Sequence, residues 1–451
     1  MGNNTVNIRE LITEILLSID KGEEHSHILL KNVLDKYDYL PQNDKNFIKR
    51  VTEGTLENRI RIDYVINMFS KTPVNKMKPL IRNLMRMSVY QVLFMDKVPD
   101  SAVCNEAVKI TGKRGFRGLQ GFVNGVLRTV SREKENIKWP DINDNSVTAI
   151  SVTYSCPERL VKILVDDYGL EVAKECLAAS LEESNLYVRI DERLVEKEID
   201  EIKAEWQQSG IEFAQSSELP YAYRLNGADK LAKLKYFQEG RYTVQDLSSM
   251  MVCELAGIKA GDTVLDMCAA PGGKSMHAAV KLALADTEAS KATGADSGIK
   301  RGRVISRDIT DYKVRLIEDN IDRLGITNIQ AEIWDATVMD DDLADMVDVV
   351  IADVPCSGMG VIGRKPDIKY NLTDDGLDSI VDLQRQIIDN ALRYVKPGGT
   401  LMYSTCTMRK AENDENVEYI LGTGMYELKE AKQLFINEEH DGFFIARLVR
   451  K

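Results

Sequence analysis

The strongest constraint on the fold is an apolar strand that runs into a glycine turn and then into a helix. In TVLDMCAAPGGKSMHAA, residues 263–266 are expected to be extended, residues 271–273 to form the turn, and helix-forming residues to begin at Ser275. From Tyr242 onward, apolar strands alternate with amphipathic helices. This alternation predicts a doubly wound, Rossmann-like α/β domain over residues 241–451.

The chain before this region follows a different pattern. From Ile8 to Lys134, apolar residues recur at helical spacing in one segment after another. The breaks between these segments fall at Pro41, Pro73, Pro79 and Pro99. Residues 1–140 are therefore predicted to form an all-α helical bundle.

Residues 141–240 show short mixed elements. LYVRID is predicted to be a strand, VEKEIDEIKAEWQQSG a helix and YAYRLNG a second strand, which together indicate a small α+β domain. Farther along, DTEASKATGADSGIKRG at 286–302 is small, polar and aperiodic, and is predicted to be a mobile loop. We therefore expect three domains, at 1–140, 141–240 and 241–451.

Charge is divided unevenly along the chain. The total is −12, but residues 1–140 hold 23 Lys plus Arg against 16 Asp plus Glu, a balance of +7, and the remainder holds 36 against 55, a balance of −19. A basic module joined to an acidic one favours binding of a polyanion, because phosphate affinity depends on local charge. The alternative is surface charge without a function. Basic residues are densest around the glycines of TGKRGFRGLQGFVNG, and we select Lys113, Arg114, Arg117 and Arg128 as candidate phosphate contacts.

Cysteine and histidine usage argues against a structural metal or a disulfide scaffold. The seven cysteines form no CxxC pair, and only four histidines are present. No stretch approaches the roughly 18 uncharged apolar residues of a membrane-spanning helix. We expect a reduced, cytoplasmic protein with no metal and no membrane partner.

Acidic residues at strand ends indicate a nucleoside cofactor. Asp308 closes RVISRD and Asp335 closes NIQAEIWD, where carboxylates are placed to hold ribose hydroxyls and an adenine amine. The turn after Asp266 allows close approach of a ligand, and the helix N-terminus after it offers free N–H groups. The alternative is that these acids cap helices or lie in solvated loops.

Two cysteines follow later strands of the same predicted sheet. DVVIADVPC ends in Asp353 and leads to Cys356, and PGGTLMYSTC leads to Cys406. Ligands of doubly wound sheets lie at the carboxyl ends of the strands, so both thiols are expected to face one pocket. A single cysteine in such a place is more often a small core residue, but two beside a cofactor turn favour chemistry.

Methylation of cytosine at C5 explains these groups. Because C5 is a poor nucleophile, a thiolate must first add to C6; the methyl group is then taken from a sulfonium sulfur, a base removes the C5 proton, and the thiol is eliminated. Asp353 is placed to bind the N3 and N4 edge of the ring, and Lys274 is placed to lower a thiol pKa or to orient Asp353. A solvated lysine at a helix start is the alternative for Lys274. The chemistry leaves open whether Cys356 or Cys406 attacks.

At these motifs the chain resembles a known family. DMCAAPGGK, ADVPCSGMG and YSTCT, with QDLSS before them and RKPDIKY between, are similar to the motifs of the RNA cytosine-5 methyltransferases. CNEAVKITG and FVNGVLR resemble the NusB-like RNA-binding domain of the RsmB (Sun/Fmu) branch, which modifies small-subunit ribosomal RNA. The resemblance spans nearly the whole chain.

The resemblance implies S-adenosyl-L-methionine as cofactor and 16S ribosomal RNA, before full assembly, as partner. It implies that Cys406 is the nucleophile, that Cys356 assists product release, and that the middle domain is RRM-like. It also implies RNA contacts at Arg364 and Lys365, although Tyr370 stands where members often carry Trp. The cofactor pocket implied is Asp266, Cys268, Ala269, Ala270, Pro271, Gly272, Gly273, Lys274, Asp308, Asp335 and Asp353.

Three other functions are compatible with parts of this pattern. A non-catalytic RNA-binding scaffold has no chemical need for Asp353, Cys356 and Cys406 together, and an exocyclic-amine methyltransferase needs no thiol. Chemistry does not separate DNA from RNA, since base extrusion serves both polymers. Only the resemblance of the helical domain selects ribosomal RNA over DNA or another RNA.

Overall fold

The computed structural model describes residues 6–22, 25–182, 185–228, 230–293 and 300–451. Its contacts divide the chain into two compact units. Unit 1 contains residues up to Leu181 together with Ile362–Asn371, and unit 2 contains Glu182–Val361 and Leu372–Lys451. Among the described residues, no helix combines the length and apolar character that crossing a bilayer requires.

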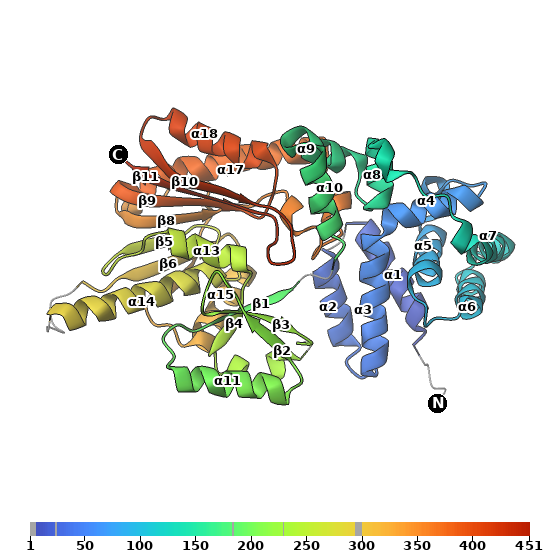
Figure 1. The fold of residues 1–451 in the computed structure, drawn as a ribbon, viewed down its shortest axis with the longest axis horizontal. Coiled ribbons are helices and arrows are strands. Elements are labelled where there is room, and N and C mark those ends of the chain that lie inside the picture. Colours follow the sequence, from blue (N-terminus) through green and yellow to red (C-terminus); the bar gives the residue numbers. More distant parts are fainter. Residues whose placement is uncertain (1–5, 23–24, 183–184, 229, 294–299) are drawn as a thin grey trace. The chain divides into compact units, whose positions relative to one another are not determined.

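Unit 1 is helical, as expected (Figure 1). Its central helix is α5, which packs against α1, α3, α4, α6 and α7 and buries Leu84, Met85 and Val89 completely. Gly54 of α3 allows close approach to α5, since a Cβ there would lie 2.1 Å from the ring of Tyr90. The helices are α1 Ile8–Asp20, α2 Ser26–Lys36, α3 Gln42–Glu57, α4 Arg59–Phe69, α5 Pro79–Phe94, α6 Asp100–Lys113, α7 Gln120–Glu133, α8 Val147–Thr153, α9 Glu158–Tyr168 and α10 Leu170–Ala179.

Residues 141–181 group with the helices that precede them. We expected a domain boundary near residue 140. The contacts place the boundary between the units after Leu181 instead. The small sheet that follows has the order β2–β3–β1–β4 with antiparallel pairing. Trp206 of α11 is fully buried on this sheet, against Tyr223 and Tyr242. Its elements are β1 Leu186–Ile190, α11 Glu196–Gln208, β2 Glu212–Gln215, β3 Ala222–Asn226, α12 Lys235–Gln238 and β4 Tyr242–Val244.

Two expectations about this part of the chain are wrong. Residues 242–244 do not open the large sheet, because β4 pairs with β1 through Val244 and Val188 and completes the small one. The predicted loop at 286–302 is helical up to Thr293, where α14 ends, because small and charged residues continue the helix without a break. Residues 294–299 of that prediction lie outside the described residues.

The large sheet has the order β10–β11–β9–β8–β5–β6–β7. Strands β9, β8, β5, β6 and β7 are parallel, and β11 pairs antiparallel with both β9 and β10. This confirms the Rossmann-like prediction. The elements are α13 Leu247–Leu255, β5 Thr263–Asp266, α14 Gly273–Thr293, β6 Arg303–Asp308, α15 Asp311–Leu324, β7 Ile329–Ile333, β8 Val347–Asp353, α17 Asp374–Tyr394, β9 Val395–Thr405, α18 Asp414–Gly422, β10 Tyr426–Leu434 and β11 Phe443–Arg450.

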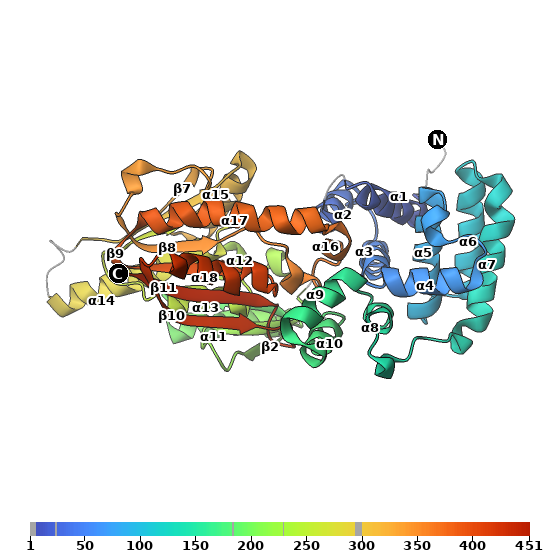
Figure 2. The same ribbon diagram turned by 90° about the horizontal axis from the view of Figure 1, so that it is seen from above.

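Both faces of the large sheet are covered. Along β8, Val350 and Ala352 face the core beneath α17 and α18, whereas Val349 and Ile351 face the core shared with α13, α14 and α15. Figures 1 and 2 show α17 and α18 on one face, with α14 on the other. A strand buried on both faces must be apolar there, which explains the unbroken apolar run VVIA at 349–352.

The segment 362–371 leaves the catalytic sequence and folds with unit 1, where it includes α16, Ile368–Asn371. Asp367 accepts hydrogen bonds from the Ser26 N–H at 3.1 Å and the Ser26 Oγ at 2.5 Å. Lys369, only 2% exposed, donates to the carbonyl oxygens of Glu57 and Ser155 at 3.2 and 3.0 Å. The buried charges of this segment thus find their partners in the helical unit.

We predict that Asp367→Ala destabilises unit 1 by about 2 kcal/mol, because the buried Ser26 N–H and hydroxyl lose their acceptor. Hydrogen exchange at the start of α2 should accelerate accordingly. Lys365→Ala, which changes an exposed residue of the same segment, is the control and should leave this exchange unchanged. Equal protection of α2 in both variants would contradict the assignment.

Candidate active site

The carboxyl ends of β5, β8 and β9 bring the predicted reacting groups together. Register pairs Asp353 with Ser404 across the parallel strands β8 and β9, so the segments after these strands lie side by side. The sulfur atoms of Cys356 and Cys406 are 3.1 Å apart. Two thiols 50 positions apart in sequence are therefore within hydrogen-bond distance.

Lys274 and Asp353 form a shielded ion pair beside the sulfurs. The Lys274 ammonium lies 2.6 Å from Asp353 Oδ2, and the Ser404 hydroxyl donates to Asp353 Oδ1 at 2.7 Å. The Lys274 side chain is 13% exposed, so its interpretation as a solvated lysine is wrong. Burial opposes its positive charge, but Asp353 above all, then Asp266 and Cys406, raise its pKa above the ordinary value.

The two sulfurs have different electrostatic surroundings. Cys406 contributes to the raised pKa of Lys274, which identifies a lysine cation as its neighbour. The pKa of Cys356 is raised well above its ordinary value by the hydrogen bond to Cys406, by burial and by the negative charges of Cys406 and Glu412. Cys268, also in the predicted pocket, has a pKa raised by burial and then by Asp266, which keeps its thiol protonated.

The glycine turn connects β5 to α14 as predicted. Gly272 has a φ of +100°, and its N–H donates to the Ala269 carbonyl at 2.7 Å, which closes the turn tightly. Asp308, 4% exposed, accepts from the Ala270 N–H at 3.0 Å and from Lys313 Nζ, also at 3.0 Å. The carboxylate at the end of β6 thus holds the backbone of the turn.

Two other predicted cofactor residues lie at the carboxyl ends of β5 and β7. Asp266 is 1% exposed and accepts from Ser275 Oγ at 2.6 Å, and burial raises its pKa to about 7. Asp335 lies two residues beyond β7 and accepts from the N–H and hydroxyl of Thr337 at 2.9 and 2.7 Å.

Two buried polar atoms beside the turn lack hydrogen-bond partners within the described part of the chain. They are Asp266 Oδ1 and Gln245 Nε2, and the Gln245 amide lies 3.7 Å from where a Cβ on Gly273 would be. A free acceptor, a free donor and the N-terminus of α14 fit the amino acid part of S-adenosylmethionine, which carries an ammonium and a carboxylate.

Sequence reasoning missed several residues of this site. Gln245 and Ser404 stand inside the quoted motifs QDLSS and YSTCT, so proximity to a motif was an available signal. No sequence signal pointed to Glu412 and Gln384, because only the fold brings them to the site.

The predicted phosphate contacts are only partly available. Lys113 pairs with Glu10 at 2.6 Å, and Arg114 pairs with Glu14 and, at 3.5 Å, with Glu10. Both glutamates belong to α1, which no local sequence pattern connected to this loop. Arg117 and Arg128 are exposed on the same part of unit 1. In segment 362–371, Arg364 and Lys365 are exposed as well.

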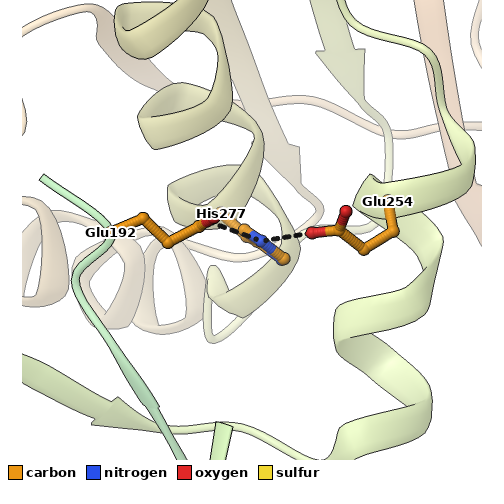
Figure 3. A group of neighbouring side chains, drawn as sticks. All are labelled: Glu192, Glu254 and His277. Atoms are coloured by element: carbon orange, nitrogen blue, oxygen red, sulfur yellow. Dashed lines mark ion pairs between the residues drawn. The ribbon is translucent and has the colours of Figure 1, made fainter. Parts of the chain in front are cut away.

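A second charged cluster joins the small sheet to α13 and α14. The ring of His277, completely buried, lies with Nε2 3.3 Å from Glu192 and 3.6 Å from Glu254 (Figure 3). These three groups have the spacing of metal ligands. Lys281 Nζ already contacts both carboxylates, at 2.8 and 2.6 Å, and supplies the cation that they require.

Burial, and then the charge of Arg189, lower the pKa of His277 to about 4 from 6.5. Between these pH values the unfolded chain binds a proton that the folded protein excludes, so stability falls as the pH is lowered through this window. Wild type should lose on the order of 3 kcal/mol of unfolding free energy across this pH window. We predict that His277→Gln does not show this loss. Thermal unfolding of both proteins at pH 7 and pH 4.5 measures this difference, and the exposed His27→Gln is the control. Parallel losses in wild type and His277→Gln would contradict it.

Comparisons with known proteins agree with this architecture. The family model "16S rRNA methyltransferase RsmB/F" matches residues 254–449, and the "NusB family" model matches residues 6–132. A probable ribosomal RNA small subunit methyltransferase B of Bacillus subtilis (strain 168) is 36% identical, over 90% of this chain and 86% of its own length. The ribosomal RNA small subunit methyltransferase B of Klebsiella pneumoniae (strain 342) is 27% identical over 99% of both chains.

Solved structures support the fold. The structure of PH0851 aligns with a TM-score of 0.79 and 22% identity, covering 99% of this chain and all of that one. The structure of NSun6 from Pyrococcus horikoshii with SFG aligns with a TM-score of 0.55 and 20% identity, over 65% of this chain and 98% of that one.

The glycine turn at the first strand of a doubly wound sheet, with acids at the following strand ends, defines the class of S-adenosylmethionine-dependent methyltransferases. Within that class, the chain belongs to the RsmB/F family of 16S rRNA methyltransferases and carries a NusB-family helical domain.

Proposed function

We propose that this protein methylates C5 of a cytosine in small-subunit ribosomal RNA, in the cytoplasm and before full ribosome assembly, through a covalent bond between Cys406 and C6. The observation that carries the proposal is the pair of sulfurs 3.1 Å apart beside the Lys274–Asp353 ion pair. A methyltransferase for an exocyclic amine needs no thiol, and a non-catalytic scaffold needs neither the thiols nor the ion pair.

The choice of nucleophile follows from charge. A thiolate is stabilised by a nearby cation and destabilised by a nearby anion. Cys406 has the Lys274 ammonium as neighbour, whereas Cys356 has the Glu412 carboxylate. Cys406 is therefore the sulfur better suited to ionise and to attack.

The proposed reaction conserves atoms and electrons. The Cys406 thiolate adds to C6 as the C5–C6 π electrons shift toward C5, and Asp353 binds the N3 and N4 edge of the ring as charge develops there. S-adenosylmethionine supplies a methyl group, held on its sulfonium sulfur, for C5. A base then takes the C5 proton, the C5–C6 double bond re-forms, and the C6–S bond breaks with its electron pair returning to Cys406. Cys356 assists this release.

Substrate contacts are proposed on both parts of unit 1 that carry exposed cations. Arg117 and Arg128 on the helical bundle, together with Arg364 and Lys365, are exposed, and we propose that they contact phosphate. Lys113 and Arg114 join them by exchanging their glutamate partners for phosphate. The names of the relatives, which act on small-subunit ribosomal RNA, support this polymer over DNA.

The roles of the two thiols predict different variant phenotypes. Cys406→Ala should abolish methylation because no sulfur adds to C6, and Cys356→Ala should accumulate a covalent protein–RNA adduct because release is slowed. Denaturing gels with labelled RNA and methyl transfer assays measure both. The buried Cys176→Ala, in unit 1, is a matched control expected to retain activity. Full activity of Cys406→Ala would overturn the assignment.

The proposed cofactor site predicts that Asp308→Asn weakens binding of S-adenosylmethionine roughly tenfold, because one charge-assisted hydrogen bond is lost. Calorimetric titration of the purified protein measures the dissociation constant. Asp311→Asn, which changes an exposed aspartate at the start of α15, should bind as wild type. An unchanged constant for Asp308→Asn would remove Asp308 from the site.

A further inference from the structure

The two active-site sulfurs can share one proton. At a separation of 3.1 Å, a thiol on one sulfur donates a hydrogen bond to a thiolate on the other. Two adjacent thiolates would repel each other, so once one sulfur has lost its proton the pair holds the second proton more tightly. The position of the remaining proton decides which sulfur is the nucleophile.

Glu412 lies on the Cys356 side of this pair and is completely buried. Its Oε2 accepts from the Ser357 N–H at 2.8 Å and from Gln384 Nε2 at 3.0 Å. Gln384 Nε2 also donates to the Pro355 carbonyl at 2.9 Å. The residues on both sides of Cys356 are thus held, directly or through Gln384, by one carboxylate.

In the described part of the chain, the second oxygen of this carboxylate has only a distant ion pair. Within the described residues, Glu412 Oε1 has no hydrogen-bond partner, and Arg409 Nη1 lies 4.0 Å away. Burial raises the pKa of Glu412, while the hydrogen bonds from Ser357 and Gln384 oppose that rise. Removed from water, its charge acts strongly on the neighbouring thiol.

The charged groups on the two sides of the sulfur pair therefore have opposite signs. Cys356 is faced by Glu412 and by Cys406, and Cys406 is faced by Lys274, whose own partner is Asp353. Tyr403 donates through its hydroxyl to the Glu412 carbonyl at 2.5 Å and remains protonated, because burial raises its pKa. The field across the two sulfurs runs from a cation to an anion.

We propose that Glu412 is a positioning residue that keeps the proton of the thiol pair on Cys356 and the negative charge on Cys406. This inference deepens the proposed function and rests on it, since it names the group that selects the nucleophile. It also gives Cys356 a defined starting state, a protonated thiol whose S–H points to the sulfur that must later leave C6.

Site-specific alkylation of the full-length protein tests the proposal. Iodoacetamide reacts with thiolates, and trypsin separates the cysteines because cleavage after Arg364 and Arg409 places them in different peptides. In wild type, labelling of Cys406 should have a midpoint at lower pH than labelling of Cys356. In Glu412→Gln, the ratio of Cys356 to Cys406 labelling at pH 7.5 should rise roughly tenfold, equivalent to one pKa unit.

Two further variants distinguish the effect of the Glu412 charge from its role as a structural support. Glu415→Gln changes an exposed glutamate in α18 and should leave the labelling ratio as in wild type. Glu412→Ala removes the hydrogen bonds as well as the charge and should lose thermal stability in addition to shifting the ratio. If Glu412→Gln labels as wild type while Glu412→Ala is disordered, Glu412 is only a structural support and the proposal is wrong.

The wild-type profile is decisive even if the variants do not fold. Ionisation of Cys356 before Cys406 would overturn the proposal without any substitution. Failure of the proposed function gives a different result, namely methylation by Cys406→Ala, and it leaves the labelling order of the two thiols unaffected.

Discussion

The parallel pairing of β8 with β9 is the constraint on which the site depends. Because both strands run in the same direction and are paired through Asp353 and Ser404, the chain segments that follow them emerge at one edge of the sheet. This pairing brings Cys356 and Cys406 close enough for contact. Strand β5, next to β8, adds the glycine turn and Lys274 at the same edge. The point where the strand order reverses therefore holds together the residues proposed to bind the cofactor and those proposed to react.

The charged groups at this edge of the sheet lie on opposite sides of the two sulfurs. The Lys274–Asp353 pair is largely removed from water, and a pair so placed is retained only with further hydrogen bonds, here from Ser404. On the other side, Glu412 holds both neighbours of Cys356. The proposed separation of charge between the two sulfurs rests on this order, with Lys274 beside Cys406 and Glu412 beside Cys356.

The sequence predicted local patterns well and long-range ones poorly. Strand β5 begins at Thr263 and ends at Asp266 as expected, because a short apolar run followed by a glycine turn favours a buried strand. Strand β4 was assigned to the wrong sheet, since three residues carry no information about which neighbour they will pair with. Glu412 and Gln384 were not predicted, because their role depends on helices and turns packing over the ends of β8 and β9. The buried partners of Asp367 were equally unpredictable, since Ser26 is more than 300 positions away.

The decapeptide 362–371 has a consequence for how such proteins can be divided. The polypeptide leaves unit 2 six residues after Cys356, contributes Asp367 and Lys369 to unit 1, and returns at Leu372. A truncation after Leu181 would remove Asp367 and Lys369, so the Ser26 N–H and hydroxyl and the carbonyls of Glu57 and Ser155 would lose these partners, and a gap would open among α2, α3 and α8. Exchange of helical domains by recombination would therefore have to carry along ten residues encoded within the catalytic part of the gene. The two units therefore depend on one continuous chain, although each has its own hydrophobic core.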